Sequence, residues 1–330
     1  MTKAGSIVIV IILATLAAAG AGVFHSGSRQ PHTDTIRLGA YEGDVGALEW
    51  IARDHGFFAR VGLAVEIRGY PSGNAAIEAM RAGEVDIATA ADLVVAKRSF
   101  DEPDLRILAD ICRYWNKGLV GRRDRGITAP ADLKGKRIAV PATSSAEHNL
   151  MVFLAMQGLS AGDVQIVDLQ PKDLVDATVA GRVDAAIVWQ PHVLAIEKGL
   201  GRNAVKLMEG GTEAHLLLVA RDVGLAPKGE AIRKLLRGLI LAEDWVRTHP
   251  DDARMYLRQR FNLDPDYLAY LWPRMSLVVS LPQEILEAMD SEARWLAQTA
   301  SRGRIPNYAE TVHSAPLQSV KPSAVSVFTR

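Results

Sequence analysis

Aromatic, hydroxyl, amide and acidic side chains follow six short apolar segments of this sequence, each time where the apolar segment ends. They offer rings for stacking and groups for hydrogen bonding, which is the chemistry of reversible binding to a small molecule. The candidate binding residues at these points are Tyr41, Glu42, Tyr70, Ser72, Gly73, Asn74, Thr89, Asp92, Thr143, Ser144, Ser145, Glu147, Trp189 and Gln190.

Each candidate also has a purely structural interpretation. Asn74, Asp92 and Ser144 or Ser145 suit the first position of a helix, where a side-chain oxygen caps free backbone N–H groups. Tyr41 and Tyr70 could simply pack at the end of a strand. Trp189 is different, because a large ring beside Gln190 and Pro191 at a strand end has few reasons to belong to a core. We therefore predict that Trp189 stacks on a ligand.

Sequence signatures of catalysis are largely absent. The segment GYPSGN carries Tyr70 where the nucleophile-elbow pattern G-x-S-x-G needs a glycine. There is no phosphate-binding loop, no G-x-G-x-x-G and no H-E-x-x-H. Glu147 and His148 are adjacent, so on a helix they point about 100° apart and make a poor ligand pair. We expect a protein that is not an enzyme and that needs no cofactor or metal.

The elements that must position the candidates occur twice. Around AGEVDIATA, from Ala82, and AGRVDAAIVW, from Ala180, the chain reads strand, helix, strand, helix, strand, with a glycine ending each second helix. This order predicts two parallel sheets. Two similar apolar segments, beginning at Lys117 and His215, flank the second copy and are predicted to cross between the halves. The fold class is therefore α/β, with two Rossmann-like lobes, two crossing strands and a helical C-terminal part.

The N-terminus is predicted to direct export. An uncharged segment from Ala4 to Phe24 contains a short strongly apolar core followed by A-x-A sites, as in a cleaved signal peptide, yet its length of about 20 residues would also span a bilayer. The predicted organisation is a signal peptide or N-terminal membrane anchor at 1–24, a linker at 25–34, lobe 1 at 35–118 plus 220–330, and lobe 2 at 119–219.

Composition excludes other classes of function. The 330 residues are 48% hydrophobic, and 38 basic residues balance 38 acidic ones, so a general nucleic-acid binder is not expected. The single cysteine, Cys112, excludes an internal disulfide and a cysteine-based zinc site.

Several motifs resemble one known family. SGNAAIEAMRAGEVDIATA, DLKGKRIAVP, VAGRVDAAIVWQPH and PLQSVKP look like the solute-binding proteins of ABC transporters for nitrate, sulfonates, taurine and thiamine precursors. The resemblance implies a type II periplasmic binding fold whose two lobes close on a ligand. It also implies a monomer that delivers a small molecule to a membrane ABC permease and its ATPase. The implied location is the periplasm, with a possible tether to the inner membrane by residues 4–24.

The resemblance places ligand contacts on residues named above and near the crossings. Those it supports are Tyr41, Ser72, Gly73, Thr89, Ser144, Ser145, Trp189 and Gln190, with Trp115 and Glu213 beside the crossings.

Two further questions concern the solute and the role. The strand ends carry Glu42, Asp44, Asp92 and Glu147 against few basic residues, which favours a neutral or amine-bearing organic solute over nitrate or a sulfonate. The alternatives to a transport role are a membrane-anchored ligand sensor on the same fold and, third, an enzyme on this fold.

Overall fold

The computed structural model describes residues 34–299 and 303–328. The predicted signal or anchor segment, and the predicted linker up to residue 33, lie outside the described residues. Within the described part of the chain, no helix has both the length and the apolar character needed to cross a membrane.

The first lobe is built on a six-stranded sheet with the order β11-β4-β10-β3-β1-β2. β1, β2 and β3 run parallel, whereas β10 is antiparallel to both of its neighbours, β3 and β4. The strands are β1 (Asp34–Tyr41), β2 (Leu63–Tyr70), β3 (Ile87–Ala91), β4 (Leu105–Tyr114), β10 (Ala214–Arg221) and β11 (Met275–Ser276).

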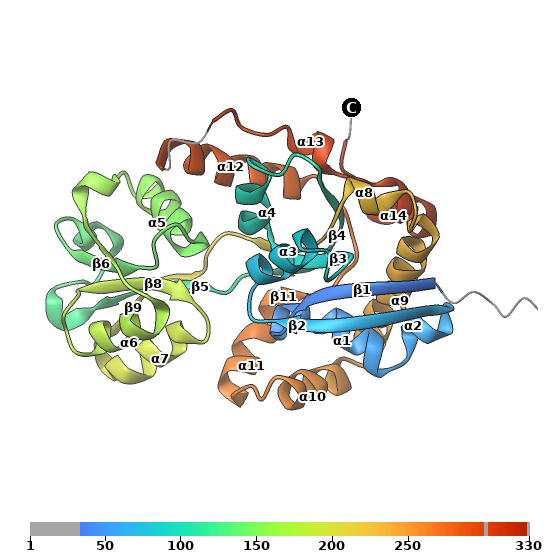
Figure 1. Ribbon diagram of the computed structural model, residues 1–330. Coiled ribbons are helices and arrows are strands. Elements are labelled where there is room, and N and C mark those ends of the chain that lie inside the picture. The colour runs from blue at the N-terminus through green and yellow to red at the C-terminus, as the bar shows by residue number, and fades with distance from the viewer. Residues whose placement is uncertain (1–33, 300–302, 329–330) are drawn as a thin grey trace, which may run out of the picture. The chain divides into compact units, whose positions relative to one another are not determined.

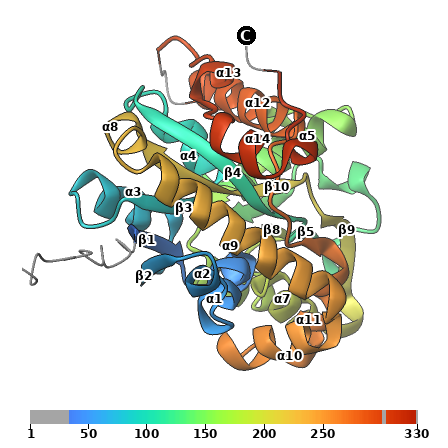
Figure 2. The ribbon, with the colours of Figure 1, turned by 90° about the vertical axis from the view of Figure 1, so that its right-hand side faces the viewer.

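Helices cover both faces of this sheet, and Figure 2 shows α9 lying across one of them. The helices between the first strands are η1 (Asp44–Gly46), α1 (Ala47–Asp54), α2 (Phe57–Arg60), α3 (Gly73–Arg81) and α4 (Asp92–Arg98). Those after β10 are α8 (Asp222–Leu225), α9 (Gly229–Thr248), α10 (Pro250–Arg260), α11 (Pro265–Leu271), η6 (Trp272–Arg274), α12 (Glu284–Thr299), α13 (Tyr308–Thr311), α14 (Ala315–Val320) and η7 (Pro322–Ala324). The C-terminal part is therefore helical, as predicted.

The second lobe is built on a five-stranded sheet with the order β7-β6-β8-β5-β9. Figure 1 shows α5 on one side of this sheet and α6 and α7 on the other. Its strands are β5 (Lys117–Arg122), β6 (Arg137–Val140), β7 (Gln165–Asp168), β8 (Ala185–Trp189) and β9 (Ala204–Gly210). Its helices are η2 (Arg123–Arg125), η3 (Pro130–Leu133), α5 (Ser145–Met156), η4 (Ala161–Asp163), α6 (Pro171–Val179), α7 (His192–Leu200) and η5 (Gly201–Asn203).

The chain changes sheet twice, which confirms the predicted two-lobed α/β class. It leaves the first sheet after Tyr114 and enters the second at Lys117, then leaves the second after Gly210 and rejoins the first at Ala214. The expected boundary at residues 219 and 220 falls inside β10, a strand of the first sheet. We therefore propose lobe 1 as 34–114 plus 214–328 and lobe 2 as 117–210.

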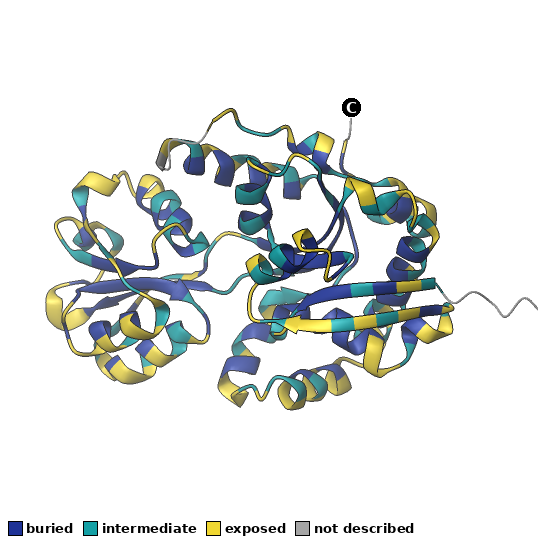
Figure 3. Cartoon of the chain, viewed as in Figure 1, coloured by how far each residue is buried: buried dark blue, intermediate teal, exposed yellow. Residues whose placement is uncertain are grey.

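Each lobe has its own core. One large cluster of buried apolar side chains fills lobe 1, and two smaller clusters lie on opposite faces of the second sheet. Figure 3 shows this burial concentrated in the strands, while the edge strand β2, after its buried first residue, mainly alternates between exposed and partly buried positions. The alternation follows from the two-residue period of side chains along a strand.

The repeated sequence pattern has a repeated hydrogen-bonded structure. In lobe 1 the Asp86 carboxylate accepts the Arg37 backbone N–H (2.9 Å) and a guanidinium N–H (2.7 Å). In lobe 2 the Asp184 carboxylate accepts the Arg137 N–H (3.0 Å) and a guanidinium N–H (2.8 Å). In each pair the aspartate precedes the third parallel strand and the arginine lies on the first, so the same clamp joins the two strands in both lobes.

The helices before these aspartates also end alike. Gly83 follows α3 with φ +73° and Gly181 follows α6 with φ +76°, left-handed conformations that glycine adopts without a steric penalty. The residue after each glycine donates its N–H to a carbonyl five residues earlier, as in a Schellman motif.

Replacing Asp184 with asparagine should destabilise the second lobe by about 1–2 kcal/mol, because hydrogen bonds to a charged acceptor exceed those to a neutral one. The hydrogen bond from Arg137 lowers the pKa of Asp184. Stabilisation by this carboxylate is therefore present above its unfolded-state pKa and lost as the pH falls through the folded-state pKa.

Urea unfolding at neutral and acidic pH would measure this effect, with the exposed Asp176→Asn as the control. Equal stability of the Asp184 variant and the wild type at neutral pH would contradict the expectation.

Candidate solute-binding site

The two sheets bring the candidate residues to the carboxyl ends of their parallel strands. In lobe 1, β1 lies between β2 and β3, and the chain leaves β1 toward β2 on one side but leaves β3 toward β4 on the other. In lobe 2, β6 lies in the same way between β7 and β8. Ligands of open α/β sheets bind outside the carboxyl ends of strands at such points of divergence. Tyr41 and Trp189 lie at two of these strand ends.

Tyr41 and Tyr70 are neighbours across the β1–β2 pair and both are partly buried. Burial, and then the charge of Asp44, raises the pKa of Tyr41 to about 12, so its phenol remains a neutral hydrogen-bonding group. Glu42 follows as an exposed residue whose N–H donates to the Tyr70 carbonyl (2.9 Å) and whose carboxylate approaches Arg260 (3.4 Å). The structure thus places these three candidates together at the carboxyl ends of β1 and β2.

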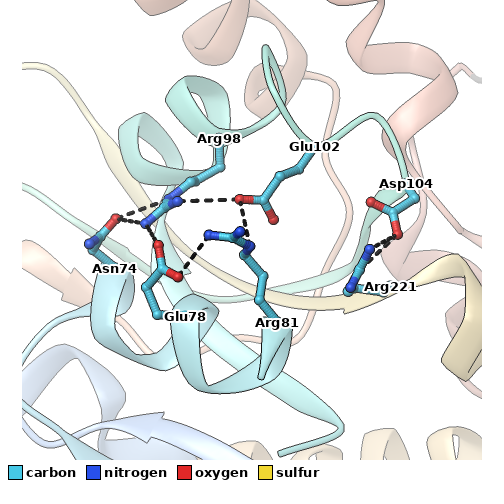
Figure 4. Close-up of polar contacts among 7 residues, drawn as sticks. All are labelled: Asn74, Glu78, Arg81, Arg98, Glu102, Asp104 and Arg221. Atoms are coloured by element: carbon cyan, nitrogen blue, oxygen red, sulfur yellow. Dashed lines mark hydrogen bonds and ion pairs between the residues drawn. The ribbon is translucent and has the colours of Figure 1, made fainter. Parts of the chain in front are cut away.

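The start of α3 is packed tightly against β3. The Ser72 hydroxyl caps this helix by accepting the Ala75 N–H (3.2 Å). A Cβ on Gly73 would lie 2.5 Å from the Ala90 Cα, so only glycine allows this approach. The side-chain amide oxygen of Asn74 accepts two hydrogen bonds from the Arg98 guanidinium (2.6 and 3.0 Å). These bonds belong to a network that includes Glu78 (Figure 4). The Asn74 side chain is thus bound within the lobe.

Figure 4 also shows how this network continues along the surface of lobe 1. Arg98 contacts Glu78 and Glu102, and Arg81 contacts the same two carboxylates. These ion pairs connect α3 with the end of α4 and hold the helix that carries Ser72.

Thr89 and Asp92 are buried. The Thr89 hydroxyl donates to the Glu49 carboxylate (3.0 Å) and accepts the Tyr41 N–H (2.9 Å). The Asp92 carboxylate accepts the N–H groups of Leu93 and His215, both at 2.9 Å. Both side chains therefore have partners inside lobe 1, and a direct contact with a solute stays a prediction for them.

The β6–α5 loop holds four candidates. Ser144 caps α5, and its hydroxyl donates to the Pro141 carbonyl (2.5 Å), while Ser145 is partly buried on the first turn. Thr143 has φ +54°, an uncommon conformation for a residue other than glycine, and the Glu147 carboxylate accepts its N–H (2.6 Å). Such a backbone conformation is found more often at functional sites than elsewhere.

Trp189 ends β8 and is partly buried, packing against the cores on both faces of the second sheet. Gln190 is buried, and its side-chain oxygen accepts the Leu194 N–H of α7 (3.1 Å). Trp115 and Glu213 lie in the two connections between the sheets, where both are partly buried. The backbone N–H of Trp115 donates to the Arg274 carbonyl (2.9 Å), and the Glu213 carboxylate is 3.9 Å from Arg113.

Sequence reasoning missed a buried cation. Lys117, only 3% exposed, begins β5 directly opposite Trp189, and its ammonium lies 5.4 Å from the centre of the Tyr114 ring. Burial lowers the pKa of Lys117, while the charges of Asp92 and Glu292 oppose that shift. The only signal in the sequence was a lysine at the start of an apolar strand, which usually marks an exposed strand end.

The acidic candidates have internal partners. Asp44 accepts a hydrogen bond from Tyr267, and the partners of Glu42, Asp92 and Glu147 are given above. These four carboxylates are thus already engaged within the protein, so their number alone does not argue against an anionic solute. Within residues 34–299 and 303–328, no cluster of three or more His, Cys, Asp or Glu residues is arranged to hold a metal ion.

Comparisons with known proteins agree on one family. The family described as NMT1/THI5 like matches residues 47–253, more than half of the chain. The taurine-binding periplasmic protein of Escherichia coli (strain K12) is 26% identical over 233 residues, which cover 70% of this chain and 66% of that protein. The match thus spans slightly less than two thirds of that relative. A putative aliphatic sulfonates-binding protein of Bacillus subtilis (strain 168) is 28% identical over 263 residues, 76% of each chain.

Solved structures show the same fold. The periplasmic aliphatic sulphonate binding protein SsuA from Escherichia coli has a TM-score of 0.72 at 20% identity, covering 84% of this chain and 91% of that one. The desulfurization enzyme DSZB has a TM-score of 0.62 at 16% identity, covering 88% and 99%. The fold therefore occurs in both binding proteins and an enzyme.

Proposed function

Since this chain belongs to the NMT1/THI5-like family, we propose that it binds a small organic solute in the periplasm and delivers it to the permease of an ABC import system. The observation that carries the proposal is the position of Tyr41, Tyr70 and Trp189 at the carboxyl ends of strands in two similar lobes. The relatives named as taurine- and sulfonate-binding proteins support it. The permease and its ATPase are the partners, and the protein acts as a monomer.

The proposed role is binding without catalysis. The likeness to DSZB is a likeness of fold at 16% identity, and fold alone does not transfer an activity. The candidate hydroxyls Ser72 and Ser144 serve as helix caps in this structure. Formation of a product from a bound solute by the purified protein alone would contradict this part of the proposal.

The proposal predicts that a solute stabilises the folded protein. Thermal unfolding of the full chain should be compared with taurine, ethanesulfonate and an uncharged aminopyrimidine, each in excess. A ligand present at 100 times its Kd adds about 2.7 kcal/mol to the free energy of unfolding. Stabilisation by taurine or the aminopyrimidine but not by ethanesulfonate would support an amine-bearing solute. Stabilisation by ethanesulfonate alone would contradict the expectation of a neutral or amine-bearing solute.

Trp189→Ala should reduce the affinity for the stabilising solute by about tenfold or more, because stacking on a large ring is lost. Trp245→Ala is the matched control, since Trp245 packs on His55 within lobe 1 with ring centroids 4.1 Å apart. Isothermal titration calorimetry would separate affinity from stability. A Trp189 variant that binds as tightly as the wild type would show that this ring does not contact the solute.

A further inference from the structure

A buried carboxyl group lies behind the candidate site. Glu49, on the first turn of α1, is 0% exposed. Its Oε1 accepts the hydrogen bond from the Thr89 hydroxyl (3.0 Å), and among the described residues its Oε2 has no hydrogen-bond partner. A buried carboxyl oxygen without a hydrogen-bond partner lowers the stability of the fold, so packing alone does not explain an acid at this position.

Glu49 connects to Tyr41 through one side chain. Thr89, which donates to Glu49, accepts the Tyr41 backbone N–H (2.9 Å). The Tyr41 carbonyl accepts the indole N–H of Trp50, the residue after Glu49 (3.2 Å). The backbone N–H of Tyr41 is therefore linked to Glu49 through Thr89, and its carbonyl is bonded directly by Trp50. Both Glu49 and Trp50 belong to α1.

The loop that follows Tyr41, residues 42–46, packs closely against the tyrosine. A Cβ on Gly46 would lie 2.5 Å from the Tyr41 carbonyl oxygen, and a Cβ on Gly43 would lie 2.3 Å from the Tyr41 ring. The backbone of this loop is thus in contact with the tyrosine on two sides. A shift of α1 at Glu49 must therefore move Tyr41 as well.

The surroundings of Glu49 disfavour a charge. Cys112 on β4 is a titratable neighbour, since the charge of Glu49 helps to raise the pKa of its thiol, and a thiol is not a cation. α2 and α9, which also pack on α1, bury only apolar residues and glycine. Burial raises the pKa of Glu49 to about 8, while the Thr89 hydrogen bond opposes the shift. The carboxyl group is therefore mainly uncharged at neutral pH.

We propose that Glu49 is a positioning residue of the solute site, whose uncharged carboxyl group holds Thr89 and, through it, fixes Tyr41 for contact with the solute. This inference rests on the proposed binding function for its affinity readout only. Ionisation of Glu49 places a charge at a fully buried position. The packing around α1 must open to hydrate that charge, and this displaces Tyr41 even though the carboxylate accepts the Thr89 hydroxyl more strongly. Solute affinity should then fall as the pH rises through the range in which Glu49 ionises.

The first test needs no solute. In the full-length protein, the backbone amide resonance of Tyr41 should titrate with a midpoint near pH 8. In Glu49→Gln, which keeps the acceptor but cannot ionise, this titration should be absent while the amide stays hydrogen-bonded. A Tyr41 amide without a titration in the wild type, or with the same titration in Glu49→Gln, would overturn the proposal.

The second test uses taurine as the probe, with calorimetry below and above pH 8. Wild-type affinity should fall by about tenfold across this range, while Glu49→Gln should keep one affinity at both pH values. Glu49→Leu should bind about tenfold more weakly at neutral pH, because the Thr89 hydroxyl loses its acceptor. Equal pH dependence in wild type and Glu49→Gln would overturn the proposal. If taurine binds no variant, the proposed solute fails, and the amide titration still decides the role of Glu49.

Discussion

Replacing His215 with leucine is expected to lower the free energy of unfolding by about 3–5 kcal/mol, the cost of leaving a buried charge without its partner. The His215 Nδ1 lies 2.9 Å from a carboxylate oxygen of Asp110, and both side chains are buried between β10 and β4. Among the described residues, the Asp110 carboxylate keeps only its hydrogen bond from the Cys112 N–H (3.2 Å) when the imidazole is removed. The variant should therefore be among the least stable single substitutions of this chain.

The pair also predicts how stability depends on pH. Burial lowers the pKa of His215, but the hydrogen bond and charge of Asp110, together with the charges of Asp92 and Glu213, leave the pKa above its usual value. A histidine with a raised folded-state pKa contributes stability that is complete below its unfolded-state pKa. That contribution is lost as the pH rises through the folded-state pKa. The leucine variant should lack this part of the pH dependence.

Urea unfolding of the wild type, the single variant and a double variant would test the pair. Asp110→Leu combined with His215→Leu should recover much of the lost stability, because both buried polar groups are then removed. His313→Leu serves as the histidine control, since His313 is only partly buried. A His215 variant that loses less than about 1 kcal/mol would show that the pair is not a stabilising contact.

Replacing Gly73 with alanine should destabilise lobe 1 by about 1–3 kcal/mol and weaken solute binding as well. The new methyl group would lie 2.5 Å from the Ala90 Cα and 3.2 Å from the Thr89 carbonyl oxygen, both backbone atoms of a buried strand. The usual gain from replacing glycine in a helix is only about 0.4–1 kcal/mol, so the clash dominates. Because α3 must move away from β3, Ser72 should shift with it.

Gly224→Ala is the matched control, because a Cβ there would meet no atom within 4 Å. Thermal unfolding and solute titration of both variants would separate the clash from the general effect of adding a methyl group. A Gly73 variant as stable as the Gly224 variant would mean that the α3–β3 packing adapts at little cost.

The fold was predictable because its signals are local. Gly83 and Gly181 mark helix ends, and each is followed by a valine, an aspartate and an apolar strand, so the repeat is visible in the sequence alone. The family resemblance was carried by the same segments, and the family match confirms it. The sheet to which β10 belongs could not be predicted, because a strand at a crossing has the same apolar pattern in either sheet.

The site was predictable only in outline. The strand ends were placed correctly, but the partners of each side chain depend on residues far along the chain. Thr89 faces Glu49, forty positions earlier, and Asn74 is held by Arg98 from the next helix. No local pattern distinguishes a hydroxyl that meets a ligand from one that meets a buried carboxyl group. Tertiary contacts decide between these roles.

The central position of β10 has a consequence for biosynthesis. β10 pairs with both β3 and β4, yet it follows the whole of lobe 2 in the chain. During synthesis, the facing edges of β3 and β4 therefore stay without their partner until about residue 221 has been made. Lobe 2 is continuous and can fold as soon as its last strand is available, whereas lobe 1 must wait. The order of translation thus makes the inserted lobe the first to mature and delays completion of the first lobe's sheet.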